Sequence, residues 1–151
     1  MAVFRERPYA RFNYQVEWDG LDPGSPSAGF SEVSGLGLEI DVIEYRAGNE
    51  RTNTPRKITG LHKVSDVTLK RGVLGAADLF EWLRAVRDGD QDQLRDVRIN
   101  LLSENREEIV ASWRLRNARP LKYTGPTLNA MACDEVAIEE LTLSCEGLDF
   151  E

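Results

Sequence analysis

Apolar and polar residues alternate strictly in the segment RFNYQVEWD, which spans residues 11–19. One side of this segment carries the apolar residues Phe12, Tyr14, Val16 and Trp18, and the residues between them are polar. Because successive side chains of a β-strand point to opposite faces, the alternation predicts a strand with one buried and one exposed face. Half-buried strands of this kind are typical of antiparallel sheets, which place one face on the core and the other in water.

Further segments show the same two-residue period. The segment VSDVTLKRG, residues 64–72, alternates through Val67 and Leu69, and residues 95–120 predict a hairpin with its turn at residues 103–106. A last strand is predicted at about residues 134–147. Its apolar positions change from even to odd numbers at Glu139 and Glu140, which predicts a β-bulge there.

One segment, GAADLFEWLRAVRDGD at residues 75–90, has a helical period instead. Its apolar stripe at the spacing i, i+3, i+4, i+7 consists of Leu79, Trp82, Leu83 and Val86. Gly89 is a typical helix end. The strands and this helix predict a mainly β protein with one α-helix, built as an antiparallel β-barrel or sandwich. A chain of 151 residues corresponds to a single domain, residues 1–151.

The stretch from Ser34 to Gly60, SGLGLEIDVIEYRAGNERTNTPRKITG, is the least usual part of the chain. Its first half continues a strand predicted over residues 30–45, with Gly35 and Gly37 at a bend or bulge. Its second half, residues 46–60, is rich in charged and turn-forming residues and predicts an extended loop. Loops of that length are uncommon in compact domains and are usually functional or disordered.

The composition excludes several classes of protein. The net charge of −7 argues against a general nucleic-acid binder, which would carry a basic surface. No apolar run approaches the ~18 residues that span a bilayer, so membrane anchoring is not expected. The N-terminal segment has no continuous apolar stretch of a secretory signal, which favours synthesis and folding in the cytosol. Cys133 and Cys145 are expected to be free thiols.

Motifs that carry chemistry are missing from the sequence. The single histidine, His62, has no cysteine or carboxylate at metal-ligand spacing. The segment GLGLEI, residues 35–40, lacks the third glycine and the following helix of a dinucleotide-binding turn. Adjacent acidic pairs such as Glu139 and Glu140 would point to opposite faces of a strand, and are interpreted as solvated or bulged positions. We therefore expect no catalytic residue, no metal and no cofactor.

A long strand followed by a charged projection favours contact with copies of the same chain or with a partner. The strand that carries Glu39 and Asp41 has a polar face as well as an apolar one. Open edges of antiparallel sheets can also continue across a subunit boundary. The alternative on pattern alone is a monomeric barrel with one long loop.

The chain resembles the tail tube proteins of contractile phages and the inner-tube proteins of extracellular contractile injection systems. Six blocks, in the same order and spacing, carry the resemblance: PYARFNYQVEWDG, AGFSEVSGLGLEIDVIEYRAGNE, TPRKITGLHKVSDVTLKRGV, LFEWL, LRNARPLKYTGPTLNA and EVAIEELTLSCEGL. The segments KYTGPTLNA and GFSEVSGLGLE are the most diagnostic. The family also resembles the haemolysin-coregulated tube proteins of type VI secretion.

This resemblance implies a β-barrel or sandwich with one flanking helix, in hexameric rings that stack into a hollow tube inside a contractile sheath. The loop of residues 46–60 would then reach the adjacent ring. The implied inter-ring contacts are Arg46, Glu50, Arg51, Arg56 and Lys57. Glu39 and Asp41 would face the lumen, where like charge would limit the sticking of an acidic cargo.

Three alternatives stay open at this point: a tube subunit of an injection system or of a phage tail, a related ring such as a tube terminator or baseplate adaptor, and a monomeric ligand-binding β-barrel or an enzyme built on one.

The resemblance implies as partners the chain itself, a sheath protein, baseplate or spike and cap proteins, and an effector protein or DNA as cargo in the lumen. It further implies assembly in the cytoplasm into a phage-tail-like particle or virion that can be released.

Overall fold

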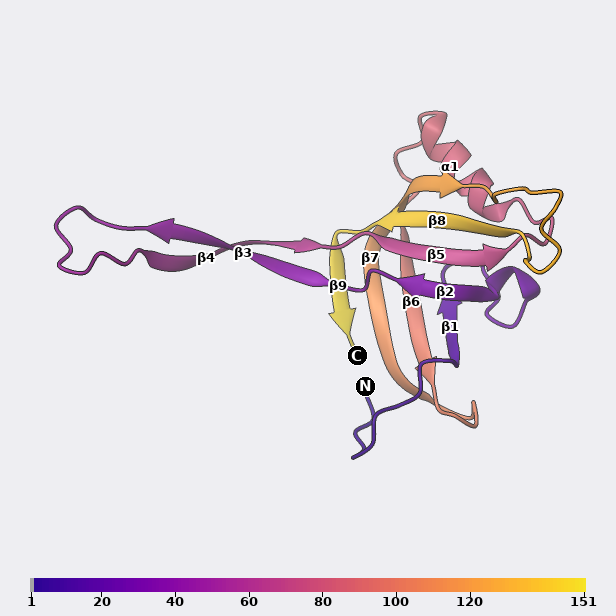
Figure 1. Cartoon of the computed structure of the whole chain (residues 1–151), viewed down its shortest axis with the longest axis horizontal. Coiled ribbons are helices and arrows are strands. Elements are labelled where there is room, and N and C mark those ends of the chain that lie inside the picture. The colour runs from indigo at the N-terminus through magenta and orange to yellow at the C-terminus, as the bar shows by residue number, and fades with distance from the viewer. Residues whose placement is uncertain (1) are drawn as a thin grey trace.

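The computed structural model describes residues 2–151, which form nine β-strands, one α-helix and one 3-10 turn (Figure 1). The strands are β1 (Tyr14–Glu17), β2 (Phe30–Ser34), β3 (Leu38–Tyr45), β4 (Arg56–Val64), β5 (Val67–Gly72), β6 (Arg95–Leu102), β7 (Ile109–Thr124), β8 (Ile138–Ser144) and β9 (Gly147–Phe150). The helix is α1 (Asp78–Arg87) and the 3-10 turn is η1 (Pro26–Ala28). A mainly β chain with a single helix confirms the fold class.

The body of the protein is built on one antiparallel sheet. Within residues 2–151 its seven strands follow the order β1-β6-β7-β8-β5-β2, with β9 paired to β7 at one side. The terminal strands β1 and β2 are not paired with each other in this order. The hydroxyl of Tyr14 instead donates a 2.7 Å hydrogen bond to the carbonyl oxygen of Phe30, so a side chain bridges the two ends of the curved sheet.

The core lies inside this curved sheet and under the helix. Every second side chain of β5 and β8 is buried, and the fully buried side chains of the sheet include Leu69, Leu115, Leu141 and Leu143. Helix α1 adds Leu79 and Trp82, and the Trp82 ring lies 5.6 Å from that of Trp18, centroid to centroid. The helical period and its end are confirmed, because α1 stops just before Gly89, whose φ of +106° suits glycine.

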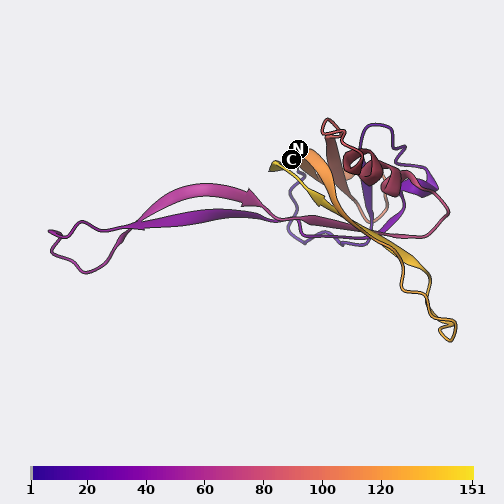
Figure 2. The ribbon, with the colours of Figure 1, turned by 90° about the horizontal axis from the view of Figure 1, so that it is seen from above.

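Strands β3 and β4 form a separate two-stranded sheet that projects far from the body, as both Figure 1 and Figure 2 show. We call β3, β4 and the residues 46–55 between them the arm. The prediction of an extended loop over residues 46–60 is wrong for the last third of that range, because residues 56–60 belong to β4. The pairing shows why: Leu61 and Gly60 together face Asp41, and this bulge interrupts the alternation that would have marked β4 in the sequence.

The strand expected over residues 30–45 is divided at Gly35. Residues 30–34 pair with β5 in the body, whereas residues 38–45 pair with β4 in the arm. Gly35 has a φ of +88°, and a β-carbon there would collide with the carbonyl oxygen of Asp66. This glycine therefore permits the close crossing of the two chain segments where the arm leaves the body.

Two further expectations about strands are wrong. Strand β8 pairs with β5 in unbroken register from Ile138 to Leu143, so the bulge expected at Glu139 and Glu140 is not there. Glu139 points inward with Leu141, and the apolar Val136 that gave the even phase lies before the strand and is exposed. Phe12, expected on the buried face of the first strand, precedes β1 and is also exposed.

Candidate assembly interface

The arm exposes a continuous series of large apolar side chains. Each of the following is at least half exposed in the isolated chain: Leu38, Ile40, Val42, Ile43, Tyr45, Ile58 and Leu61. Single exposed apolar residues are ordinary, but a contiguous apolar surface usually marks a site of interaction. A two-stranded hairpin is also marginal by itself in water, so this arm is expected to gain stability from contact with another protein surface.

Six of these seven side chains form two patches on opposite faces of the arm, and the seventh, Leu61, lies at the bulge in β4. Strand β3 alternates without a bulge, so Leu38, Ile40 and Val42 share one face; we call them the proximal patch. Ile43 and Tyr45 lie on the other face, and Ile43 is paired with Ile58; these three form the distal patch. The apolar surface thus changes face halfway along the arm. A partner must cover one face near the body and the opposite face near the tip.

Glu39 and Asp41, the predicted lumen residues, lie on the face opposite the proximal patch. Glu39 is paired in register with Lys63, and the Asp41 carboxylate lies 3.2 Å from the Lys63 ammonium group. The structure therefore brings together the two acids that the sequence nominated and adds a lysine that it did not. Two carboxylates and one ammonium leave one negative charge at this position of each copy.

The predicted inter-ring residues divide into two groups. Arg46 holds the tip together, donating hydrogen bonds to the carbonyl oxygens of Thr52 (3.0 Å) and Glu50 (3.1 Å). The Glu50 carboxylate lies 3.2 Å from Arg56, so this pair is also satisfied within the arm. Arg51 and Lys57, in contrast, have exposed side chains without a hydrogen-bond or ion-pair partner in residues 2–151. These two cations are free to meet a second molecule.

A second exposed apolar segment, which the sequence reasoning missed, connects β7 and β8. We call residues 125–137 the β7–β8 loop. It carries Leu128, Met131 and Val136, which are 82%, 89% and 77% exposed. In Figure 2 this loop projects from the side of the body that lies away from the arm. Part of it lies in the diagnostic segment KYTGPTLNA, but its lack of alternation gave no sign of whether it would be buried or exposed.

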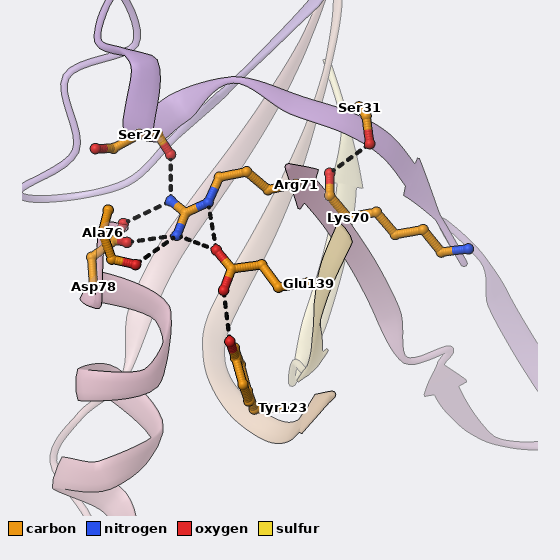
Figure 3. A network of polar contacts seen from close by, with 8 residues as sticks. All are labelled: Ser27, Ser31, Lys70, Arg71, Ala76, Asp78, Tyr123 and Glu139. Atoms are coloured by element: carbon orange, nitrogen blue, oxygen red, sulfur yellow. Dashed lines mark hydrogen bonds and ion pairs between the residues drawn. The ribbon is translucent and has the colours of Figure 1, made fainter. Parts of the chain in front are cut away.

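A buried polar network lies between the sheet and α1, as Figure 3 shows. Arg71 on β5 is fully buried, and its guanidinium Nη2 lies 2.8 Å from Asp78 Oδ1 and 2.7 Å from Glu139 Oε1. Its Nη1 donates to the carbonyl oxygen of Ser27 at 2.7 Å. The Tyr123 hydroxyl donates to Glu139 Oε2 at 2.6 Å, and this hydrogen bond raises the pKa of Tyr123 to about 12.

Buried ionisable clusters sometimes mark active sites, but this one is closed. The guanidinium nitrogens of Arg71 all have protein acceptors, and Glu139 accepts from both Arg71 and Tyr123. The network therefore joins η1, α1, β5, β7 and β8 and leaves no polar atom of its own for a substrate. The interpretation of Glu139 as a solvated or bulged residue is wrong, because Arg71 compensates its burial.

The structure offers little for ligand chemistry elsewhere. Among residues 2–151 there is no cluster of three or more histidine, cysteine or acidic residues that could hold a metal ion. A shallow hollow beside Trp18 is lined by charged side chains, and two of them, Asp96 and Arg114, form a 2.6 Å ion pair with each other. Cys133 and Cys145 are both free thiols, as expected. None of the helices in the described part of the chain is long and apolar enough to cross a membrane.

Comparison with known proteins assigns this fold. Residues 10–149 match the family described as T4-like virus tail tube protein gp19. The chain belongs to this tail tube family. The match includes the arm and the β7–β8 loop, so the surfaces described above lie within the part of the chain that matches the family. No curated protein sequence matches the chain.

Solved structures of injection systems are similar over nearly the whole tail tube domain. A chain of the sheath–tube complex of an extracellular contractile injection system, PVC, in the extended state is 28% identical, with a TM-score of 0.82 over 97% of this chain and 93% of that one. A chain of the anti-feeding prophage tube-terminating cap is 26% identical, with a TM-score of 0.83 over 100% of this chain and 95% of that one. The tail tube protein is thus homologous to chains of these injection systems.

A type VI secretion protein shares the fold at lower similarity. Hcp1 from Flavobacterium johnsoniae is 13% identical, with a TM-score of 0.54 over 91% of this chain and 93% of that one. The resemblance found in the sequence is confirmed by these comparisons. Hcp1 shares the fold alone, and the roles of individual arm residues belong to the proposal that follows.

Proposed function

We propose that this chain is the structural, non-catalytic subunit of the hollow inner tube of a contractile injection machine. Copies assemble as hexameric rings, and the rings stack inside a sheath to conduct cargo. The observation that carries this proposal is the arm, whose apolar patches lie on two opposite faces and are left without partners by the chain's own body. A self-assembling tube supplies partners for both faces, because each subunit has neighbours beside it and neighbours in the next ring.

The arm residues take two roles in this proposal. Arg46, Glu50, Arg51, Arg56 and Lys57 lie at the end of the arm and make the inter-ring contact. Arg46 and the Glu50–Arg56 pair fix the shape of the tip, and Arg51 and Lys57 bind the neighbour. A single exposed ion pair contributes only ~0.2–1 kcal/mol, but a ring repeats the same contacts in each subunit.

Glu39 and Asp41 face the lumen in this proposal. Lys63 halves the negative charge that the two acids would otherwise give, and the remaining charge still repels an acidic cargo weakly. Changing both acids to lysine would give each copy three cations here. Cargo loading and ejection that are unchanged in Glu39→Lys/Asp41→Lys particles would contradict the assignment.

An extracellular injection system is the machine that we favour, because the similar chains of PVC and the anti-feeding prophage cover nearly all of this one. The tube then contacts a sheath, a baseplate or spike and a cap, and carries an effector protein. Particles assemble in the cytoplasm and are released as a phage-tail-like particle. The family match to a phage tail tube keeps a second candidate, in which the particle is a virion and the cargo is DNA.

The oligomeric state of the purified protein tests this proposal. Size-exclusion chromatography with light scattering and negative-stain microscopy should show rings of six subunits and filaments of stacked rings. A variant whose residues 38–64 are replaced by a short glycine–serine turn should remain a folded monomer, because the body has its own core. A tube terminator would instead give single rings that never stack. A wild-type protein that stays monomeric at all concentrations would contradict the function.

A further inference from the structure

The arm and the β7–β8 loop leave the body on opposite sides (Figure 2). Both carry large apolar side chains that nothing in their own chain covers. Repeated head-to-tail association of identical subunits requires two different surfaces on each copy, placed apart and complementary to each other. The two projections of this chain fulfil the first condition, because they are distinct segments separated by the width of the body.

The charges of the two projections are complementary. The exposed cation Arg51 in the tip of the arm has no hydrogen-bond or ion-pair partner in residues 2–151. The β7–β8 loop has only acidic charges, Asp134 and Glu135, and both are exposed without an ion pair in the described part of the chain. Opposite unpaired charges on two surfaces favour their correct association over contacts between like surfaces.

The apolar side chains also fit this arrangement. The distal patch of the arm consists of Ile43, Tyr45 and Ile58 on one face. The β7–β8 loop offers Leu128, Met131 and Val136 on an irregular backbone. Its internal hydrogen bonds are local, from the backbone amides of Ala132 and Met131 to Asn129. A loop with so few internal hydrogen bonds can adapt its shape to the surface of the arm, and the flexible Met131 side chain assists this.

We propose that the β7–β8 loop of one copy receives the distal half of the arm of a second copy in the next ring. In this contact the distal patch packs on the apolar side chains of the loop, and Arg51 in the arm tip pairs with Asp134 and Glu135. Lys57 is not part of it, because it is paired with Glu44 on the opposite face of the arm. The inference rests on the proposed function, because it needs stacked rings, but it adds the receiving surface. The proximal patch, on the opposite face, is then left for a neighbour within the same ring.

Charge reversal with rescue tests the contact in the full-length protein. Arg51→Glu and Asp134→Lys/Glu135→Lys should each give intact rings whose stacking into filaments is reduced at least tenfold. The variant with all three substitutions should restore filaments, because opposite charges face each other again. Arg84→Glu on the exposed face of α1 changes the net charge as much as Arg51→Glu and should stack normally.

Disulfide trapping provides a second measurement that does not depend on electrostatics. Cys133 is an exposed native thiol in the β7–β8 loop. Mild oxidation of the Arg51→Cys variant should link copies into ladders longer than six subunits, and Arg51→Cys/Cys133→Ser should abolish these ladders. Rings and filaments that form without ladders and without rescue would overturn the inference and leave the proposed function intact. If a different chain, such as a sheath protein, covers the loop, the loop variants will stack normally by themselves and the inference is also wrong.

Discussion

Arg71 and Glu139 form a buried ion pair that joins two neighbouring strands, with Nε–Oε1 and Nη2–Oε1 distances of 3.0 and 2.7 Å (Figure 3). The two residues are paired in register on β5 and β8, and both are nearly inaccessible to solvent. Asp78 at the first turn of α1 and the carbonyl oxygen of Ser27 complete the shell around the guanidinium group. The pair thus fixes the helix on the sheet that supports the arm.

Removing one partner of this pair should destabilise the body severely. In Glu139→Leu the buried guanidinium loses its closest carboxylate, and the expected cost in the free energy of unfolding is ~3–5 kcal/mol. The double variant Arg71→Met/Glu139→Leu should cost less than Glu139→Leu alone, because no uncompensated charge remains buried. Urea unfolding followed by tryptophan fluorescence at one fixed protein concentration measures both, since assembly also adds to the apparent stability. A double variant less stable than Glu139→Leu would contradict this.

Tyr123 should titrate later than an ordinary tyrosine. Its hydroxyl donates to the Glu139 carboxylate, and this hydrogen bond, with burial as a second cause, raises the pKa of Tyr123 to about 12. The pKa is about 10 in the unfolded chain. The stabilisation is therefore complete below pH 10 and is lost as the pH rises from 10 through 12. Near-ultraviolet absorbance should resolve this late titration, and Tyr123→Phe should remove it without changing the other tyrosines.

The ion pair between the N-terminal segment and the β6–β7 turn should persist to an unusually low pH. Arg5 pairs with Glu104 at the β6–β7 turn, and hydrogen bonding from its guanidinium lowers the pKa of Glu104 to about 2. A carboxylate with a lowered pKa stabilises the folded state above its unfolded value of about 4.3, and the effect is lost as the pH falls through 2. NMR titration of the Glu104 side chain should show this value. Arg5→Ala should return the pKa towards 4.3; an unchanged low value would exclude Arg5 as the cause.

Gly35 should tolerate no side chain, whereas Gly48 in the arm tip should tolerate one. Gly35→Ala places a β-carbon against the Asp66 carbonyl oxygen at a φ of +88°, and we expect a loss of at least ~1–2 kcal/mol from the backbone conformation alone. Gly48 has nothing within 4 Å of such a β-carbon, so Gly48→Ala should stay within ~0.5 kcal/mol of wild type. Thermal unfolding compares the two directly. Equal effects of the two substitutions would show that the crossing at Gly35 is not tightly constrained.

The local periods in the sequence predicted a large part of this structure. The helix at residues 78–87 and the hairpin of β6 and β7 follow from apolar spacing, because each buries one face on a shared core. The sequence indicated that residues 46–57 project, and they lie at the end of the arm, whereas their inter-ring role stays a prediction. Strand β4 was missed because its bulge at Gly60 and Leu61 interrupts the alternation. The inward position of Glu139 was missed because a buried carboxylate is acceptable only when Arg71, 68 residues away, compensates it.

The sequence by itself determined the class of this protein: antiparallel strands, one amphipathic helix, and the membership of the tail tube family that the order of its blocks indicated. Only the tertiary structure decided that the charged segment is the end of a projecting hairpin and that its apolar side chains divide between two faces. It also placed the β7–β8 loop on the far side of the body. The physical reason is that side-chain period depends on near neighbours along the chain, whereas exposure depends on which distant segments fold against them.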